Sequence, residues 1–315
     1  MGRNRLRLVF GCFVALGLVA ACGGDTGSTL PPATVVTTTT AAATTTVPAT
    51  TTAAPTTTLP STTTTAAATT TTGVVPDTDA LVATGFGVLG WFDHAAGAWV
   101  PWPEPDAMPE VEGAIFDVVT LQPGAATVEG SGMSVCEITG NLSVEFDPPL
   151  PVRLGEPGAV AVLGATWDLV PRPVTISDAP GDRLQTALDH LAANGIDDTA
   201  PPFVQHVEAD LDGDGAAEGV LVVERLGDDR LGGPGDYSLT MVFGDGSSAV
   251  VAESYGVADN PYVLAHVVSA VADLDGDGVM EVVADNRYYE GTGSVAWEYA
   301  PGPALTEALA GGCGA

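Results

Sequence analysis

The chain has 315 residues, and its 40 acidic and nine basic side chains give a formal net charge of −31 at pH 7. A surface of this sign repels nucleic-acid phosphates and anionic membranes, so we expect no nucleic-acid partner. The charge instead suits a cation-rich medium or a cationic partner, although an organism with an acidic proteome would produce the same composition.

Residues 1–21 are predicted to form a lipoprotein signal peptide. Three arginines precede an apolar run, residues 8–21, which is shorter than a typical membrane-spanning helix. The run ends in Val19-Ala20-Ala21-Cys22, which is similar to a bacterial lipobox, where the cysteine is lipidated and becomes the first mature residue. We therefore expect an extracytoplasmic protein anchored to a bacterial cell membrane through Cys22. The alternative is an ordinary secretory signal in which this cysteine is incidental.

Residues 22–74, which begin at the lipidated cysteine, are predicted to be a disordered stalk. Between Ser28 and Thr72 the chain consists almost entirely of Thr, Ala and Pro, so it cannot bury enough apolar surface to offset its ordering entropy. At ~3.1 Å per residue, an extended backbone could reach on the order of 140 Å. Glycosylation of the threonines would distinguish such a stalk from a bare flexible linker.

Residues 75–177 are predicted to form an N-terminal β region, because short apolar runs alternate with Pro, Gly and Asp. Trp91, Phe92, Trp99 and Trp102 flank one turn, and for these rings we favour a hairpin core over a sugar-stacking surface. The other predicted strands are Phe116–Leu121, Val135–Ile138, Leu142–Phe146, Val160–Leu163 and Trp167–Val170.

Residues 178–202 are predicted to contain one helix and a linker. Asp182 is a candidate N-terminal cap, and His190 lies off the apolar stripe, so we expect its side chain to be solvated. The apolar stripe itself recurs at helical spacing and consists of Leu184, Leu188 and Leu191.

Two copies of one acidic loop, Asp210–Glu218 and Asp273–Glu281, dominate the rest of the chain. Both have carboxylates at loop positions 1, 3, 5 and 9 and glycine at position 6. Ca²⁺ takes about six to eight oxygen ligands, and the glycine permits the sharp turn that aims them inward. An EF-hand would need an acidic residue at position 12, where Leu221 and Ala284 stand. The loops thus share only the EF-hand opening, and acidic turns without metal are the alternative.

We expect both loops to bind Ca²⁺ in preference to Mg²⁺, because Mg²⁺ demands near-ideal octahedral geometry and sheds water reluctantly. The peptide oxygen at position 7 would complete each ligand set. The predicted ligands are Asp210, Asp212, Asp214, Ala216 and Glu218 in the first loop, and Asp273, Asp275, Asp277, Val279 and Glu281 in the second.

Each loop lies in a repeat with four apolar runs, which predicts the order strand, acidic loop, strand, turn, strand, turn, strand. In the first repeat the runs are Phe203–Val207, Val220–Val223, Tyr237–Phe243 and Ala249–Ala252. In the second they are Val267–Val271, Val282–Val283, Val295–Tyr299 and Leu305–Leu309.

The Asp-x-Asp-x-Asp-Gly-x-x-Glu loop followed by an apolar strand resembles the calcium loop of FG-GAP (integrin-alpha-like) and VCBS repeats, over residues 203–315. The resemblance implies a β-propeller-type calcium module used for binding, with no particular ligand. The expected fold is mainly β, with antiparallel repeats of propeller-blade type, an N-terminal β region and one α-helix. A propeller typically needs four to eight blades. We therefore favour a separate N-terminal sheet over degenerate blades that complete a propeller.

Cys136 and Cys313 are predicted to form a disulfide. Cys12 would leave with the signal peptide and Cys22 would be acylated, so these would be the last two thiols in an oxidising compartment. The alternative is a pair of buried free thiols.

The sequence contains no catalytic motif that would indicate a particular reaction. The sequence has no G-x-S-x-G, H-E-x-x-H, C-x-x-C or P-loop motif, and its four histidines are scattered. Tyr288, Tyr289 and Glu290 could form a site, but aromatic packing explains them as well.

The leading hypothesis is a calcium-stabilised envelope lipoprotein that binds an envelope glycan or a protein. A secreted glycan-acting enzyme with unidentified acidic residues and a purely structural envelope protein are the alternatives.

Overall fold

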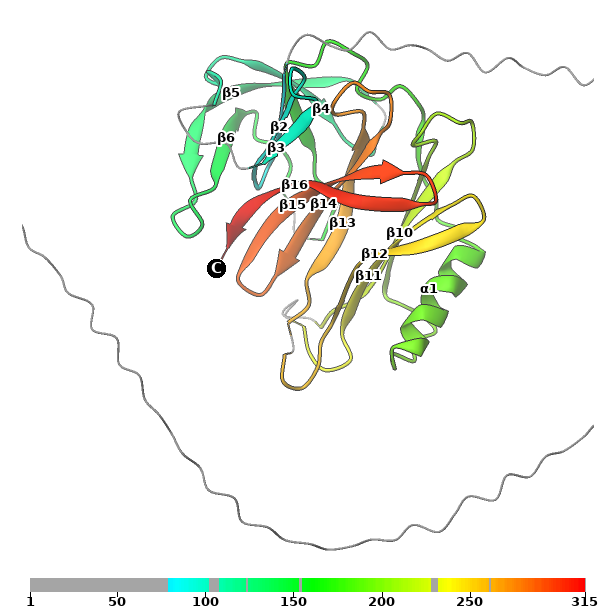
Figure 1. Ribbon diagram of the computed structural model, residues 1–315. Coiled ribbons are helices and arrows are strands. Elements are labelled where there is room, and N and C mark those ends of the chain that lie inside the picture. The colour runs from blue at the N-terminus through cyan, green and yellow to red at the C-terminus, as the bar shows by residue number, and fades with distance from the viewer. Residues whose placement is uncertain are drawn as a thin grey trace, which may run out of the picture. The chain divides into compact units, whose positions relative to one another are not determined.

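The computed structural model describes residues 79–101, 108–122, 124–152, 155–227, 232–260 and 262–314. The predicted signal peptide, Cys22, the stalk and Trp102 lie outside these residues. The described part is mainly β, with antiparallel sheets and one helix, which confirms the predicted fold class (Figure 1). Within that part, the helix falls short of the length and apolar character needed to cross a membrane.

Seven antiparallel strands form a curled sheet, here called the N-terminal sheet, in the order β3-β2-β1-β7-β4-β5-β6. The curl encloses a core in which the rings of Phe116 and Phe146 meet edge to face, 5.2 Å apart. Trp91 and Trp99 pack against hydrophobic cores, as predicted. The strands are β1 (Ala80–Thr84), β2 (Gly87–Asp93), β3 (Ala98–Pro101), β4 (Ile115–Val119), β5 (Ala126–Val135), β6 (Leu142–Asp147) and β7 (Val160–Leu163).

Each acidic-loop repeat forms a meander of four antiparallel strands in chain order, at the predicted apolar runs. The first repeat sheet comprises β9 (Phe203–Ala209), β10 (Glu218–Arg225), β11 (Tyr237–Gly244) and β12 (Ser247–Tyr255), with β8 (Val174–Ile176) added beside β9. The second repeat sheet comprises β13 (Ala265–Ala272), β14 (Glu281–Tyr288), β15 (Gly291–Ala300) and β16 (Ala304–Gly314).

The sheets stack in layers, with the second repeat sheet in the middle (Figure 1). Val268 and Val282 pack in a core shared with the first repeat sheet, whereas Ala270 and Val283 pack in a core shared with the N-terminal sheet. Because both of its faces are covered, β13 is buried along its whole length, which accounts for its nearly continuous apolar sequence. The N-terminal strands thus form their own sheet and are not arranged as further four-stranded blades.

Helix α1 (Asp182–Ala193) covers the outer face of the first repeat sheet through its leucine stripe. Gly181 precedes the helix and no side chain caps it, so the prediction that Asp182 is the cap was wrong. Its carboxylate lies instead in the first turn, where its negative charge interacts favourably with the helix dipole and stabilises the helix. The prediction for His190 was also incomplete, because its Nε2 lies 2.7 Å from the carboxylate of Glu253 on β12.

Two predicted strands of the N-terminal region differ from the structure. Val135 ends β5, and residues 137–139 form a turn, so Val135–Ile138 is not a separate strand. Trp167–Val170 is not a strand either, because its polar groups bond to the second acidic loop and not to a neighbouring strand.

A buried polar network joins the N-terminal sheet to the second repeat sheet. The Asp285 carboxylate on β14 accepts hydrogen bonds from the hydroxyls of Ser269 (2.6 Å) and Ser294 (2.7 Å). The Gly158 N–H donates to Ser269 Oγ (2.9 Å), and Thr84 Oγ1 lies 2.9 Å from Ser294 Oγ. Burial raises the pKa of Asp285, and the two serine hydroxyls oppose that shift.

Replacement of Asp285 by alanine should lower the free energy of unfolding by about 1–3 kcal/mol, because two serine hydroxyls lose their acceptor in a core that excludes water. Urea unfolding followed by tryptophan fluorescence would measure the loss. The matched control is Glu290→Ala, an exposed acidic residue in the turn after β14, which should change stability by less than about 0.5 kcal/mol. Identical midpoints for the two variants would contradict a stabilising role of the network.

The structure joins Cys136 and Cys313 in the predicted disulfide, with Cα atoms 5.6 Å apart. The bond ties the end of β5 to the last strand, β16. That strand lies close against β2, because a Cβ on Gly311 would lie 2.4 Å from the peptide oxygen of Val88. Glycine at this position therefore permits the approach that brings the two cysteines together.

Candidate metal centre

The two acidic loops have the same backbone conformation. Asp210–Glu218 connects β9 to β10, and Asp273–Glu281 connects β13 to β14. The glycine at position 4 has φ 77° in both loops, and the glycine at position 6 has φ 92° in the first and 90° in the second. These left-handed angles favour glycine, so the repeated Gly-x-Gly defines the shape of each loop.

The hydrogen bonds inside the two loops match one for one. The carboxylate at position 1 accepts the N–H groups of positions 4 and 6, and the carboxylate at position 3 accepts the N–H of position 5. The glutamate at position 9 reaches back to the N–H of position 2. In this order the distances are 2.8, 3.1, 3.2 and 2.8 Å in the first loop. They are 2.7, 3.1, 3.1 and 2.7 Å in the second.

Three carboxylates converge in each loop and could hold a metal ion. One oxygen from each lies within 4.8 Å of the others, in the sets Asp210, Asp212 and Glu218, and Asp273, Asp275 and Glu281. The position-5 carboxylates, Asp214 and Asp277, lie outside these sets and accept the N–H of position 7 at 2.7 and 2.6 Å. The peptide oxygens of Ala216 and Val279 stay predicted ligands.

The second cluster is buried, which sets it apart from ordinary acidic turns. Asp273, Asp275 and Glu281 are 4%, 6% and 1% exposed. Glu281 Oε2 accepts the Leu274 N–H, but Glu281 Oε1 has no hydrogen-bond partner among the described residues. A buried carboxylate oxygen without a donor is unfavourable unless a cation compensates its charge. This oxygen is therefore the clearest single sign of a cation site.

Burial and mutual repulsion raise the pKa values of this cluster. Burial, together with the charge of Asp277, raises the pKa of Asp273 to about 6 and that of Asp275 to about 7. Burial raises the pKa of Glu281 well above its usual range, and the charge of Asp275 adds to the shift. In the first loop, burial raises the pKa of Glu218. The second loop therefore holds its full negative charge near neutral pH only when a cation balances it.

A segment of the N-terminal region holds the second loop from outside. The Trp167 indole N–H donates to the peptide oxygen of Asp273 at 2.8 Å, and the Asp273 N–H donates to the Leu169 oxygen at 2.8 Å. These contacts explain why residues 167–170 leave the sheet. Sequence reasoning missed them because they join positions more than 100 residues apart in the chain.

Arg172 links the two loops. Its guanidinium donates to the peptide oxygens of Leu211 (2.8 Å) and Gly278 (2.6 Å), one from each loop, and also to that of Asp210. The Met280 N–H donates to the same Leu211 oxygen at 2.8 Å. None of these oxygens comes from position 7, so Arg172 does not compete for the predicted ligands.

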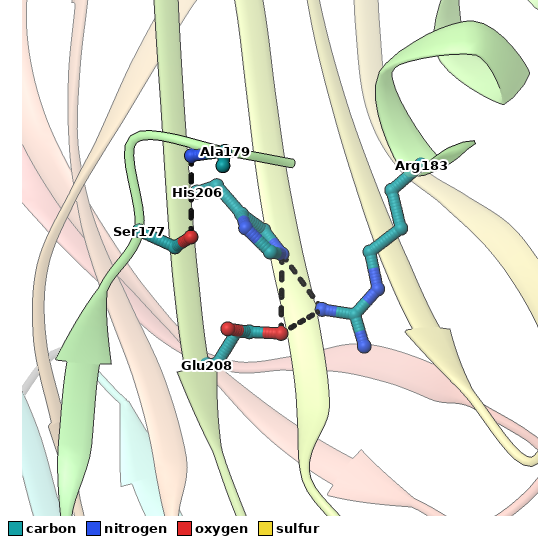
Figure 2. Close-up of polar contacts among 5 residues, drawn as sticks. All are labelled: Ser177, Ala179, Arg183, His206 and Glu208. Atoms are coloured by element: carbon teal, nitrogen blue, oxygen red, sulfur yellow. Dashed lines mark hydrogen bonds and ion pairs between the residues drawn. The ribbon is translucent and has the colours of Figure 1, made fainter. Parts of the chain in front are cut away.

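A second polar cluster lies under the start of α1 (Figure 2). Arg183 Nη1 lies 2.7 Å from His206 Nε2 and 2.6 Å from Glu208 Oε1. Because arginine only donates, His206 Nε2 accepts, and its buried Nδ1 has no partner among the described residues. Burial lowers the pKa of His206 against the opposing charge of Glu208, which favours the neutral ring. The cluster therefore fastens the helix to β9.

The candidate residues Tyr288, Tyr289 and Glu290 lie at the end of β14 opposite the second loop. Tyr289 stacks on Tyr262 with ring centroids 4.3 Å apart, so the structure does not bring it to the acidic cluster.

Metal binding at the second loop should release protons near neutral pH. A carboxyl whose folded pKa is raised holds a proton that the unfolded chain has lost, so falling pH stabilises the metal-free fold and opposes cation binding. Calorimetry at about pH 6.5 in PIPES and in ACES, two buffers that bind calcium weakly and differ in ionisation enthalpy, should report the release of roughly one proton or more at the second loop. Asp275→Asn should reduce that number more than Asp212→Asn does. Binding enthalpies that are equal in both buffers would contradict the expected proton release.

No family model, curated protein or solved structure matches this chain.

Proposed function

We propose that this chain is a cell-envelope lipoprotein that presents a calcium-stabilised β-repeat module for binding or adhesion. The observation that carries the proposal is the buried second cluster, whose Glu281 Oε1 has no partner among the described residues. The matched first loop supports it, because two loops with the same carboxylate spacing and the same internal hydrogen bonds are hard to explain as incidental turns. The resemblance to FG-GAP and VCBS repeats is in keeping with the same proposal.

Calcium fits the donor set better than other common cations. All the converging donors are hard carboxylate oxygens, which suit Ca²⁺ or Mg²⁺ and offer nothing to metals that prefer nitrogen or sulfur. Each loop turns at two glycines, and nothing in it imposes the near-ideal octahedral coordination that Mg²⁺ demands. This favours Ca²⁺, which accepts more variable coordination. Asp210, Asp212 and Glu218 would hold one ion, and Asp273, Asp275 and Glu281 the other. The position-5 side chains and position-7 oxygens would complete the shells.

Calorimetric titration of the metal-stripped, full-length protein tests the metal sites. We expect two bound Ca²⁺ ions per chain and at least tenfold weaker binding of Mg²⁺. Binding of the protein to isolated cell-envelope fractions, with calcium and with chelator, then tests the adhesive role. Titration without heat of binding, together with envelope association that chelator does not change, would refute a calcium-stabilised binding module.

The anchor at Cys22 has an independent test. The wild-type protein should partition into the detergent phase, whereas Cys22→Ala should remain in the aqueous phase. Mass spectrometry of the mature N-terminus should find an acylated cysteine. An unmodified Cys22 would remove the lipoprotein part of the proposal and leave the calcium module intact.

A further inference from the structure

We propose that a cleft beside the two acidic loops binds a small organic cation, an amine carried on an apolar body. The inference rests on the proposed function, since it names the ligand class of the same module. The cleft has a volume of about 670 Å³ and lies between residues 117–122 and 124–126, at the end of β4 and the start of β5, and residues 167–174. Pockets of ~300–1,000 Å³ are typical of small-molecule sites.

The charges around the cleft favour a cation. Two exposed carboxylates, Asp117 and Asp168, line it, and neither forms an ion pair within the described residues. The one basic side chain of the lining, Arg172, is already engaged with three peptide oxygens of the acidic loops. The chain as a whole carries a net charge of −31, so its long-range field disfavours an anionic ligand.

The same cleft offers apolar surface for the body of the ligand. Trp167 and Val118 line it and are half-buried, and Val170, also in the lining, is 39% exposed. The ring of Trp167 is held in place because its N–H donates to the Asp273 oxygen. A fixed tryptophan in a cleft that two carboxylates also line is a favourable setting for an ammonium group, through cation–π attraction and ion pairing.

The acidic loops hold one wall of this cleft. Trp167 bonds to the second loop, and Arg172 bonds to both loops. Ordering of the loops by calcium therefore fixes the position of these two lining residues. The affinity of the cleft for its ligand would therefore depend on whether the metal sites are filled.

A series of three ligands with one apolar body tests the charge preference. 2-Phenylethylamine is the cation, 2-phenylethanol the neutral analogue and phenylacetate the anion. With the full-length, calcium-loaded protein, titrations followed by ligand-observed NMR should show the amine binding at least tenfold more tightly than the alcohol. Phenylacetate should bind more weakly than either. Chelator should weaken amine binding at least tenfold.

The variant Asp117→Asn/Asp168→Asn tests the residues. It should weaken amine binding at least tenfold and change the dissociation constant of the alcohol by less than twofold. The matched control is Glu298→Gln/Glu307→Gln, which removes the same charge from exposed positions outside the cleft lining. The control should leave amine binding within twofold of wild type, and both variants should keep the calcium affinity of the wild type.

Equal binding of amine and alcohol, or an unchanged amine affinity in Asp117→Asn/Asp168→Asn, would overturn the proposal. Its failure is separable from failure of the proposed function, because calcium binding is measured on its own. A protein that binds two calcium ions but shows no amine preference refutes only the cleft. A protein that binds no calcium refutes the module, and the ligand series still decides the charge preference of the cleft.

Discussion

Saturating calcium is expected to raise the melting temperature of the metal-stripped protein by roughly 10–20 °C. Each site contributes ~2.7 kcal/mol when free calcium is 100 times its dissociation constant, provided that the unfolded chain does not bind. For a folded region of this size, 1 kcal/mol corresponds to about 2–4 °C. The physical reason is the repulsion among carboxylates that the folded loops hold within 4.8 Å of one another. Differential scanning calorimetry with calcium and with chelator measures the shift.

Single-site variants show how much of the rise in melting temperature comes from each loop. Asp210→Asn and Asp273→Asn should each abolish part of the shift and leave the other site able to bind. The larger loss is expected for Asp273→Asn, because the second cluster is buried whereas Asp210 and Asp212 are partly exposed. Magnesium at the same concentration should give a much smaller shift. If chelator leaves the melting temperature unchanged, the loops are acidic turns and nothing more.

Loss of the Cys136–Cys313 disulfide is expected to lower the free energy of unfolding by up to about 5 kcal/mol, because the bond closes a loop with a sequence separation of 177 residues. The bond restricts the unfolded chain, and longer loops lose more freedom when they are closed. Guanidinium unfolding of Cys136→Ser/Cys313→Ser should also show a steeper dependence on denaturant, because the unfolded chain becomes less compact.

Reductant provides the control for this experiment. It should destabilise the wild-type protein by a similar amount and leave Cys136→Ser/Cys313→Ser unaffected. Thiol labelling of the unfolded, unreduced protein, read by peptide mapping, should find no label at either position. Labelling of both Cys136 and Cys313 would show that the bond does not form in the isolated protein.

Much of the repeat region could be predicted because its information is local. The carboxylates of each loop accept hydrogen bonds from backbone N–H groups of the same nine residues, so the spacing of Asp, Gly and Glu is enough to define the turn. The eight strands of the repeats follow from apolar runs between turn residues, for the same reason. The fold class and the two acidic clusters could therefore be predicted from the sequence.

Contacts between distant segments could not be predicted in this way. Trp167–Val170 has the composition of a strand, but its partner is a loop about 100 residues further on, and this tertiary contact overrides the local preference. Arg172, whose guanidinium links the two loops, does not belong to any local sequence motif that would have indicated this role. Nothing in the spacing around Asp285 indicates that two serines from other strands will enclose it.

The hydrogen bonds between the two loops have a consequence for the response to calcium concentration. The Leu211 oxygen accepts from both Arg172 and Met280, so the first loop cannot change shape without disturbing the second. An ion bound in one loop would therefore order part of the other in advance, and by reciprocity each ion would raise the affinity for the other by the same factor. Occupancy would then climb over a narrower span of calcium concentration than independent sites allow, and the protein would respond at a threshold.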